Sequence, residues 1–255
     1  MPALFVEQRS IVRTIWGNPE LVLLIFAGSA AEFALNRAVD WLFYTNEIPR
    51  DPIGRLFSTV RYAQEIVFSD EDRALRAIDR ISQIHSEVER RRGQSIPDWA
   101  YRDVLYMLID YSERAHRLLY GPLSMAERQE LYEVFRRVGA GLRIPSLPES
   151  YAEWRPDRKL HLDRDLICSN HTKLLFKQYR RHLGPWRYEV LLQVQAQVVP
   201  DEVRKLLGLT RVDLLSQLIR AYGVVERLSL QWLVEGVLIP PQYWGRVREL
   251  DRGTG

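Results

Sequence analysis

Helix start signals recur along nearly the whole chain, and they constrain the fold more than any other feature. Most combine a capping Asn, Asp or Ser with a proline or an acidic residue in the first turn. They stand at Asn18-Pro19-Glu20, Asp51-Pro52, Ser69-Asp70-Glu71-Asp72, Pro97-Asp98-Trp99, Ser124-Met125-Ala126-Glu127 and Pro200-Asp201-Glu202. No alternating polar and apolar run is long enough to predict a sheet. The sequence therefore predicts an all-α fold of about eight to ten helices.

A chain of 255 residues can enclose a large core without disulfides or metals. It corresponds to one large domain, or to one domain with an appendage. We expect one helical domain over residues 18–240, preceded by a segment at 1–17 and followed by a tail at 241–255. One or two further helices are expected at Thr210–Val225 and Glu226–Val237.

Prolines interrupt the helical pattern past the middle of the chain. Pro145, Pro148 and Pro156 predict a connector, and the following segment, Leu160–Leu183, is only weakly helical in pattern. The connector could mark a domain boundary. We prefer a single domain, because the helices that follow are too few to form a separate core.

Composition and charge exclude several classes of function. The net charge of +3 is spread along the chain, whereas a nucleic-acid-binding surface needs a clustered basic face. The most apolar stretch, Leu21–Leu35, carries Glu32 and is shorter than the roughly 20 apolar residues of a membrane span. No secretory signal is recognisable, and the single cysteine, Cys168, is expected to be buried or half-buried. We therefore expect a soluble, cytoplasmic protein without a nucleic-acid partner, for which peripheral contact with a membrane stays open.

A histidine on an apolar stripe is the first candidate for chemistry. In the helix expected from Ser69 to Arg92, His85 shares a face with Ile78, Ile81 and Val88. Such an imidazole either donates a hydrogen bond within the core or presents a nitrogen to a metal or haem iron. Spacing alone favours the core histidine, because a lone histidine is weak evidence for a ligand.

An arginine and a threonine form the second candidate constellation. Arg55 and Thr59 stand four residues apart in the helix that begins at Asp51-Pro52, so their side chains share a face. A buried arginine needs a carboxylate, a phosphate or a propionate as its partner. On spacing alone, an ion pair with an acid such as Asp40 or Glu47 explains it.

Six segments recur in a recognisable order along the chain. They are Asp51–Thr59 (D-P-x-G-R-L-x-x-T), Ile84–Val88 (x-H-x-x-V), Tyr120–Glu127, Gly141–Pro145, Leu147–Tyr151 and Pro200–Leu209. Taken together, they resemble a known family, the latex clearing proteins and ER-bound oxygenases, and the resemblance covers roughly residues 18 to 240. That family includes rubber oxygenases and fungal enzymes that cut prenyl side chains.

The resemblance implies helices around haem b, with His85 as the proximal iron ligand. It places Arg55 and Thr59 on the distal side, where Arg55 contacts the cofactor and stabilises negative charge. Asp40 is the first choice for a base that acts on an allylic C–H, and Glu32 is the second. The implied activity is a dioxygenase reaction, in which O₂ cleaves a hydrophobic isoprenoid or another alkene.

The chain departs from the family's pattern at positions that bear on activity. Asn36 lies in a segment where many members carry His-Pro, and Ser58 stands where rubber-cleaving members have a lysine before the threonine. These departures keep an alternative open, namely a non-catalytic haem-binding protein or a helical partner-binding protein of the same fold.

Overall fold

The computed structural model is all-helical, which confirms the predicted fold class; it describes residues 3–44 and 52–211, without the side chains of residues 42, 44 and 52–57. Within those ranges the only β-type pairings are two isolated bridges, Leu4 with Asp70 and Asn36 with Leu166. The described helices are α1 (Ile11–Trp16), α2 (Pro19–Leu35), the 3-10 turn η1 (Arg37–Val39), α3 (Asp40–Tyr44), α5 (Pro52–Phe68), α6 (Glu71–Arg92), α7 (Asp98–Leu119), α8 (Met125–Gly141), α9 (Tyr151–Asp165), α10 (Asn170–Leu183), α11 (Pro185–Val198) and α12 (Asp201–Leu207).

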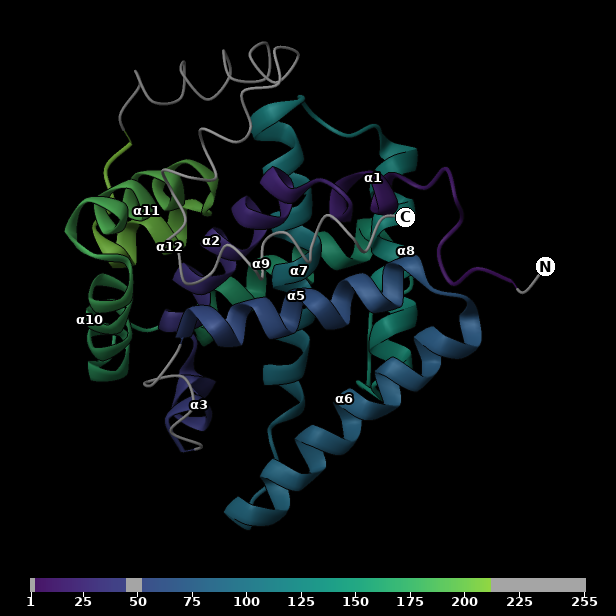
Figure 1. Ribbon diagram of the computed structural model, residues 1–255, viewed down its shortest axis with the longest axis horizontal. Coiled ribbons are helices and arrows are strands. Elements are labelled where there is room, and N and C mark those ends of the chain that lie inside the picture. Colours follow the sequence, from purple (N-terminus) through teal and green to yellow (C-terminus); the bar gives the residue numbers. More distant parts are fainter. Residues whose placement is uncertain (1–2, 45–51, 212–255) are drawn as a thin grey trace.

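Helices α2 and α7 pack against each other at the centre of the fold (Figure 1). Asn18 caps α2 by accepting a hydrogen bond from the Leu21 amide, and a proline opens its first turn. α2 is apolar around its circumference, as expected for a helix covered on all sides. Gly28 permits the close approach to α7, because a Cβ there would lie 2.3 Å from the Tyr111 ring.

Helices α5 and α6 form a hairpin on one side of this core. They meet at Ser69–Asp70 and spread apart toward their other ends (Figure 1). Near the turn, Glu65 of α5 pairs with Arg80 of α6 at 2.7 Å and with Arg73 at 3.5 Å. Helix α6 ends at Gly93, whose φ of 69° lies in the left-handed region.

Two predictions past the middle of the chain are wrong, namely that the connector extends through Pro156 and that Leu160–Leu183 is only weakly helical. Pro145 and Pro148 do lie between helices, but α9 begins at Tyr151 and continues through Pro156. The proline removes one backbone hydrogen bond. Buried side chains on both sides of it pack the helix against the core, and tertiary packing thus outweighs the local preference.

The start of the chain also belongs to the core. Val12, Ile15 and Trp16 of α1 are fully buried, and α1 packs on α8 and α2. From residue 212 onward, the chain lies outside the described residues. The helices expected at Thr210–Val225 and Glu226–Val237, the tail at 241–255 and the expected domain limits therefore stay predictions.

Two other expectations concern single features of the chain. None of the described helices combines the length and apolarity needed to cross a membrane. Cys168 is exposed, so the expectation of a buried or half-buried thiol is wrong. It lies in the short connection between α9 and α10.

Candidate functional site

Helix α6 places His85 at the edge of the core. The helix begins at the predicted start signal, but its capping residue is Asp70 rather than the expected Ser69: Asp70 accepts a hydrogen bond from the Arg73 amide. Along the His85 face, Ile78 is buried, Ile81 packs on the core, and His85 is only half-buried. The imidazole therefore lies where the apolar stripe leaves the core, rather than inside it.

Tyr101 of α7 forms one wall beside this imidazole. Its ring lies 5.1 Å from the His85 ring between centroids, at an angle of 52°. The Tyr101 hydroxyl donates to Oε1 of Glu89 at 3.2 Å, and the Ile96 amide donates to the same oxygen at 2.7 Å. Burial, together with the charge of Glu89, raises the pKa of Tyr101, so the phenol stays a neutral donor.

An ion pair brings Asp40 to the helix that carries His85. Arg92 donates from Nη2 to Oδ2 of Asp40 at 2.8 Å, and its guanidinium carbon lies 3.9 Å from the centre of the Trp41 ring. Arg92 follows His85 by seven residues, two helical turns, and so lies on the same face of α6. The structure thus places the start of α3 along the His85 face.

The distal pair predicted on α5 is described only in part. Thr59 is exposed on α5, whereas its neighbour Val60 is buried. Arg55 lies in the first turns of the same helix, and its side chain is outside the described residues. Arg55 and His85 stand at similar sequence distances from the α5–α6 turn, on the two helices that spread apart (Figure 1).

The sequence analysis missed a line of buried polar residues between α2, α7 and α9, which we call the polar seam. These side chains are at most 5% exposed, although most of them carry charge. Its members are Glu32, Asn36, Asp103, Asp110, Arg158, His161 and Asp165.

Arg158 is the centre of one half of the polar seam. It donates to both oxygens of Glu32 at 2.7 Å, and to Oδ2 of Asp110 at 3.1 Å from Nε and 3.0 Å from Nη2. Arg114 donates to the other Asp110 oxygen at 2.7 Å. Burial disfavours the charge of Asp110, but Arg114 and Arg158 outweigh it and lower the pKa of Asp110. Because both oxygens of Glu32 accept hydrogen bonds from Arg158, this residue, the second choice for a base, is engaged in a structural ion pair.

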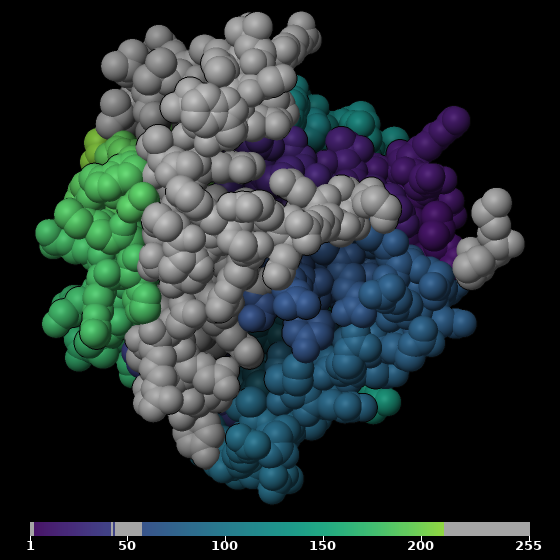
Figure 2. All heavy atoms as spheres, in the orientation of Figure 1, coloured from purple at the N-terminus to yellow at the C-terminus, as the bar shows by residue number. Residues whose placement is uncertain are grey.

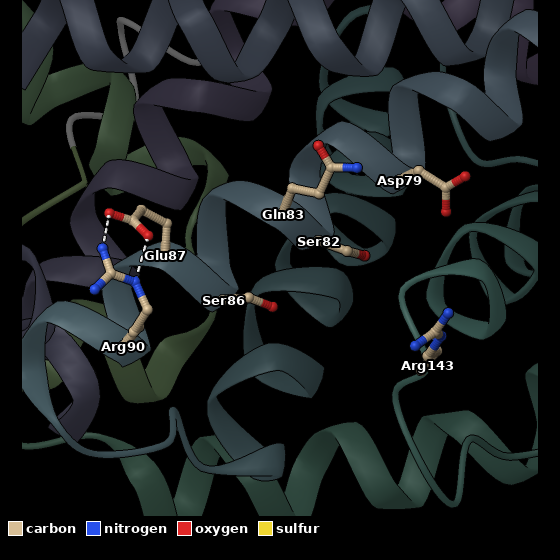
Figure 3. Close-up of a pocket in the computed structure, with 7 residues that line it drawn as sticks. All are labelled: Asp79, Ser82, Gln83, Ser86, Glu87, Arg90 and Arg143. Carbon is tan, nitrogen blue, oxygen red and sulfur yellow. Dashed lines mark hydrogen bonds and ion pairs between the residues drawn. The ribbon is translucent and has the colours of Figure 1, made fainter.

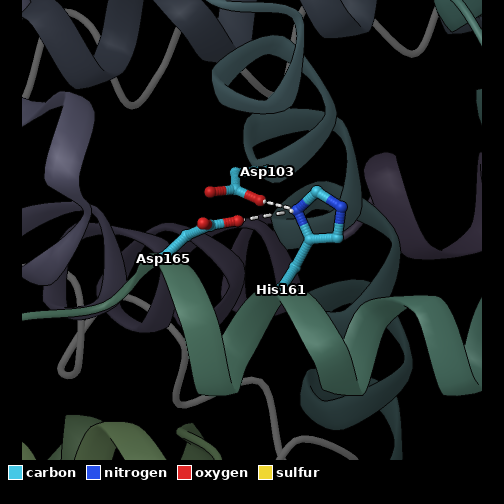
Figure 4. Close-up of side chains that lie close together, drawn as sticks. All are labelled: Asp103, His161 and Asp165. Carbon is cyan, nitrogen blue, oxygen red and sulfur yellow. Dashed lines mark hydrogen bonds and ion pairs between the residues drawn. The ribbon is translucent and has the colours of Figure 1, made fainter.

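His161 is the centre of the other half (Figure 4). Its Nδ1 contacts Oδ1 of Asp103 and lies 3.1 Å from Oδ2 of Asp165. Asn36 donates to the second Asp103 oxygen at 2.5 Å, and Arg164 donates to both Asp165 oxygens at 2.7 and 2.6 Å.

This trio offers donor atoms within 4.8 Å of one another, of types that bind divalent cations. The neighbouring Asn36 and Arg164 already donate hydrogen bonds to both carboxylates. The group is therefore satisfied as a hydrogen-bonded cluster. The signal for it in the sequence was the spacing of Arg158, His161 and Asp165 at i, i+3 and i+7, which the prolines before it obscured.

A polar pocket of about 550 Å³ lies on a different face of α6 (Figure 3). Glu87 and Arg90 pair through two hydrogen bonds on one side of it, and Arg143, which follows α8, lies on the other side below Asp79 (Figure 3). His85 is not among its lining residues, and its polar walls do not suit an apolar ligand. The lining residues are Asp79, Ser82, Gln83, Ser86, Glu87, Arg90 and Arg143.

These features define an all-helical protein that combines buried ion pairs in its core with a half-buried histidine at its edge, beside the ring of Tyr101. A model of the family described as "ER-bound oxygenase mpaB/B'/Rubber oxygenase, catalytic domain" matches residues 17–228. The chain belongs to this family, which confirms the resemblance read from its motifs. No curated protein and no solved structure gives a significant match.

Proposed function

We propose that this protein is a haem b-dependent oxygenase that cleaves a hydrophobic alkene, an isoprenoid or a similar compound, in the cytoplasm. His85 would hold the haem iron, and Arg55 and Thr59 would act on the bound O₂ and substrate. The observation that supports the proposal best is the half-buried imidazole of His85, which shares a helix face with the Asp40–Arg92 ion pair. Membership in a family of oxygenase catalytic domains supplies the reaction class.

The surroundings of His85 fit a haem. An axial imidazole must be accessible to iron, and His85 is not enclosed by the core. Ile81 and Val88 supply apolar contacts on the same face, and the Tyr101 ring supplies an aromatic one. By contrast, His161 is 3% exposed and contacts two carboxylates through Nδ1, so it is a poor candidate for a haem ligand.

When bound, the haem supplies the activation of O₂, and the protein supplies ligand, charge and access. The Arg55 guanidinium contributes a permanent positive charge where negative charge develops on oxygen. Thr59, an exposed residue of α5, contributes a hydroxyl that would orient the reacting groups by hydrogen bonding.

Asp40 accepts the proton from the allylic carbon. Arg92 fixes the carboxylate through Oδ2, and Oδ1 makes no hydrogen bond with any described residue. The Asp40 side chain as a whole is 42% exposed. A carboxylate fixed at one oxygen and open at the other has the geometry that a general base requires.

The absorption spectrum of the purified protein, reconstituted with haemin, tests the ligand assignment. We expect a Soret band that the His85→Ala variant lacks. The control variant is His182→Ala, which removes a half-buried histidine at the end of α10 and should keep the band. A protein that gives no Soret band, or a His85→Ala variant that keeps the wild-type spectrum, would overturn the proposal.

Oxygen consumption with a panel of alkenes tests the catalytic roles. Arg55→Ala is expected to lower the rate about 10²–10³-fold, as the loss of one preorganised donor does elsewhere. Asp40→Asn should keep the spectrum and lose turnover. A wild-type protein that shows the Soret band but consumes no O₂ with any alkene would identify the non-catalytic alternative that Asn36 and Ser58 keep open.

A further inference from the structure

Helix α10 exposes a face made of cations. Its inner face packs against α2 and α5 through Leu175 and Tyr179. On its outer face, Leu174, Lys177 and Arg181 follow at i, i+3 and i+7 and therefore share one side of the helix. The exposed cations of α10, which we call the basic face, are Lys173, Lys177, Arg180 and Arg181.

Acidic residues are scarce in the sequence around the basic face. Residues 166–200 contain five lysines and arginines and a single acidic residue, Glu189. No ion pair among the described residues involves a member of the basic face. The net charge of this segment is therefore 5 − 1 = +4, whereas the net charge of the whole chain is only +3. The charge was not apparent as a cluster in the sequence, because the cations are spaced by three and four residues and only the helix gathers them.

Two large apolar side chains are exposed on the same two helices. Leu174 is 47% exposed on the outer face of α10, and Trp186 is 45% exposed in the first turn of α11. Arg187 lies over the Trp186 ring at 4.5 Å. α10 lies at the edge of the molecule with α11 next to it (Figure 1), and both form one outer margin in the space-filling view (Figure 2).

We propose that α10 and the start of α11 dock onto an anionic phospholipid surface. The basic face contacts the lipid headgroups, and Leu174 and Trp186 enter the interfacial layer. An amphipathic helix with cations on its exposed side and a flanking tryptophan is suited to this boundary. A nucleic acid would attract the same cations, but it would gain nothing from an exposed leucine. The inference uses no ligand of His85, so it can fail or hold independently of the proposed oxygenase.

Sedimentation with vesicles tests the docking surface. The full chain should bind vesicles of phosphatidylcholine mixed with phosphatidylserine, and not vesicles of phosphatidylcholine alone. Lys177→Gln with Arg181→Gln should weaken binding about 25-fold, since each cation near an anionic surface contributes about a fivefold factor. The matched control, Arg9→Gln with Arg76→Gln, removes two exposed cations elsewhere and should bind like wild type.

Leu174→Gln separates the lipid from a purely electrostatic partner. It should weaken vesicle binding, and vesicles should shift the tryptophan emission of the wild type to shorter wavelength but shift that of Trp186→Phe less. Circular dichroism checks that each variant keeps its helices. Equal vesicle binding by the α10 variant and its control would overturn the proposal. The proposal would also be overturned if the wild type bound a DNA duplex more tightly than the vesicles and Leu174→Gln changed the binding of neither.

Discussion

Replacing Arg158 with methionine removes the one cation that joins two buried carboxylates. The guanidinium donates hydrogen bonds at 2.7 to 3.1 Å to Glu32 and Asp110. Methionine fills similar space and cannot donate. The variant therefore leaves Glu32 without its charged partner and Asp110 with Arg114 alone.

The expected loss is about 3–5 kcal/mol in the free energy of unfolding at neutral pH, as for other buried pairs broken on one side. For a chain of this size, that corresponds to a fall in melting temperature of roughly 10 °C. Arg155→Met is the matched control, because Arg155 is exposed on the same helix. It should stay within about 0.5 kcal/mol of wild type.

The loss should also depend on pH. In the wild type, the pKa of Asp110 is below its ordinary value of 3.8, because the charges of Arg114 and Arg158 outweigh burial. Its contribution to stability is therefore present above about pH 4 and disappears as pH falls through the lowered pKa. In the variant, burial raises the pKa of Asp110 relative to wild type, and protonation relieves the buried charge at a higher pH. The difference between the two proteins should be largest near pH 7 and shrink below about pH 5.

Urea unfolding, followed by circular dichroism across this pH range, measures both effects. A loss below about 1 kcal/mol at pH 7 would show that water or a rearranged side chain replaces Arg158. A loss of the expected size that does not change with pH would show that packing, rather than charge, explains it.

Three further substitutions test packing, a buried hydrogen bond and a helix cap, each by its free energy of unfolding in urea. Gly28→Ala should lower the free energy of unfolding by about 1–3 kcal/mol, because the new methyl would lie 2.3 Å from the Tyr111 ring, which is held in place by a hydrogen bond from the Tyr111 hydroxyl to Glu32. An unchanged free energy of unfolding would show that α2 and α7 can move apart. Tyr151→Phe should lower the free energy of unfolding by about 1.5–3 kcal/mol, because it removes the 2.7 Å hydrogen bond from the Tyr151 hydroxyl to the buried Glu113 carboxylate. Burial, together with this hydrogen bond, raises the pKa of Tyr151 to about 12. An unchanged free energy of unfolding would contradict the hydrogen bond. Ser124→Ala should cost about 1 kcal/mol by removing the capping box at the start of α8, and a change near zero would show that the cap is replaced by water.

Local signals were sufficient to predict most of the helices. Asn18 and Ser124 cap α2 and α8 through the side-chain hydrogen bonds that their sequence context predicts, whereas Asp70 caps α6 in place of the expected Ser69. These interactions span three residues, and the sequence displays them directly. The prediction was wrong at α9, where Pro156 indicates a break and only packing against distant helices opposes it.

The candidate site was predictable to a different extent for each of its residues. The face of His85 follows from helical periodicity, and the structure places it where the apolar stripe leaves the core. The pairing of Asp40 with Arg92 joins residues 52 positions apart, and no spacing rule indicates it. The polar seam was missed for the same reason, because Glu32 and Arg158 are 126 positions apart.

The polar seam also explains how the core positions the candidate site. Asn36 caps η1 by accepting a hydrogen bond from the Ala38 amide, and it donates to Asp103 of α7. Asp40 follows Asn36 by four residues. Tyr101, whose ring lies beside that of His85, precedes Asp103 by two residues. One buried hydrogen bond therefore joins the segments that supply a carboxylate and an aromatic wall to the His85 face. Asn36 thus has a structural role, which is to tie the segment just before Asp40 to the helix that carries Tyr101.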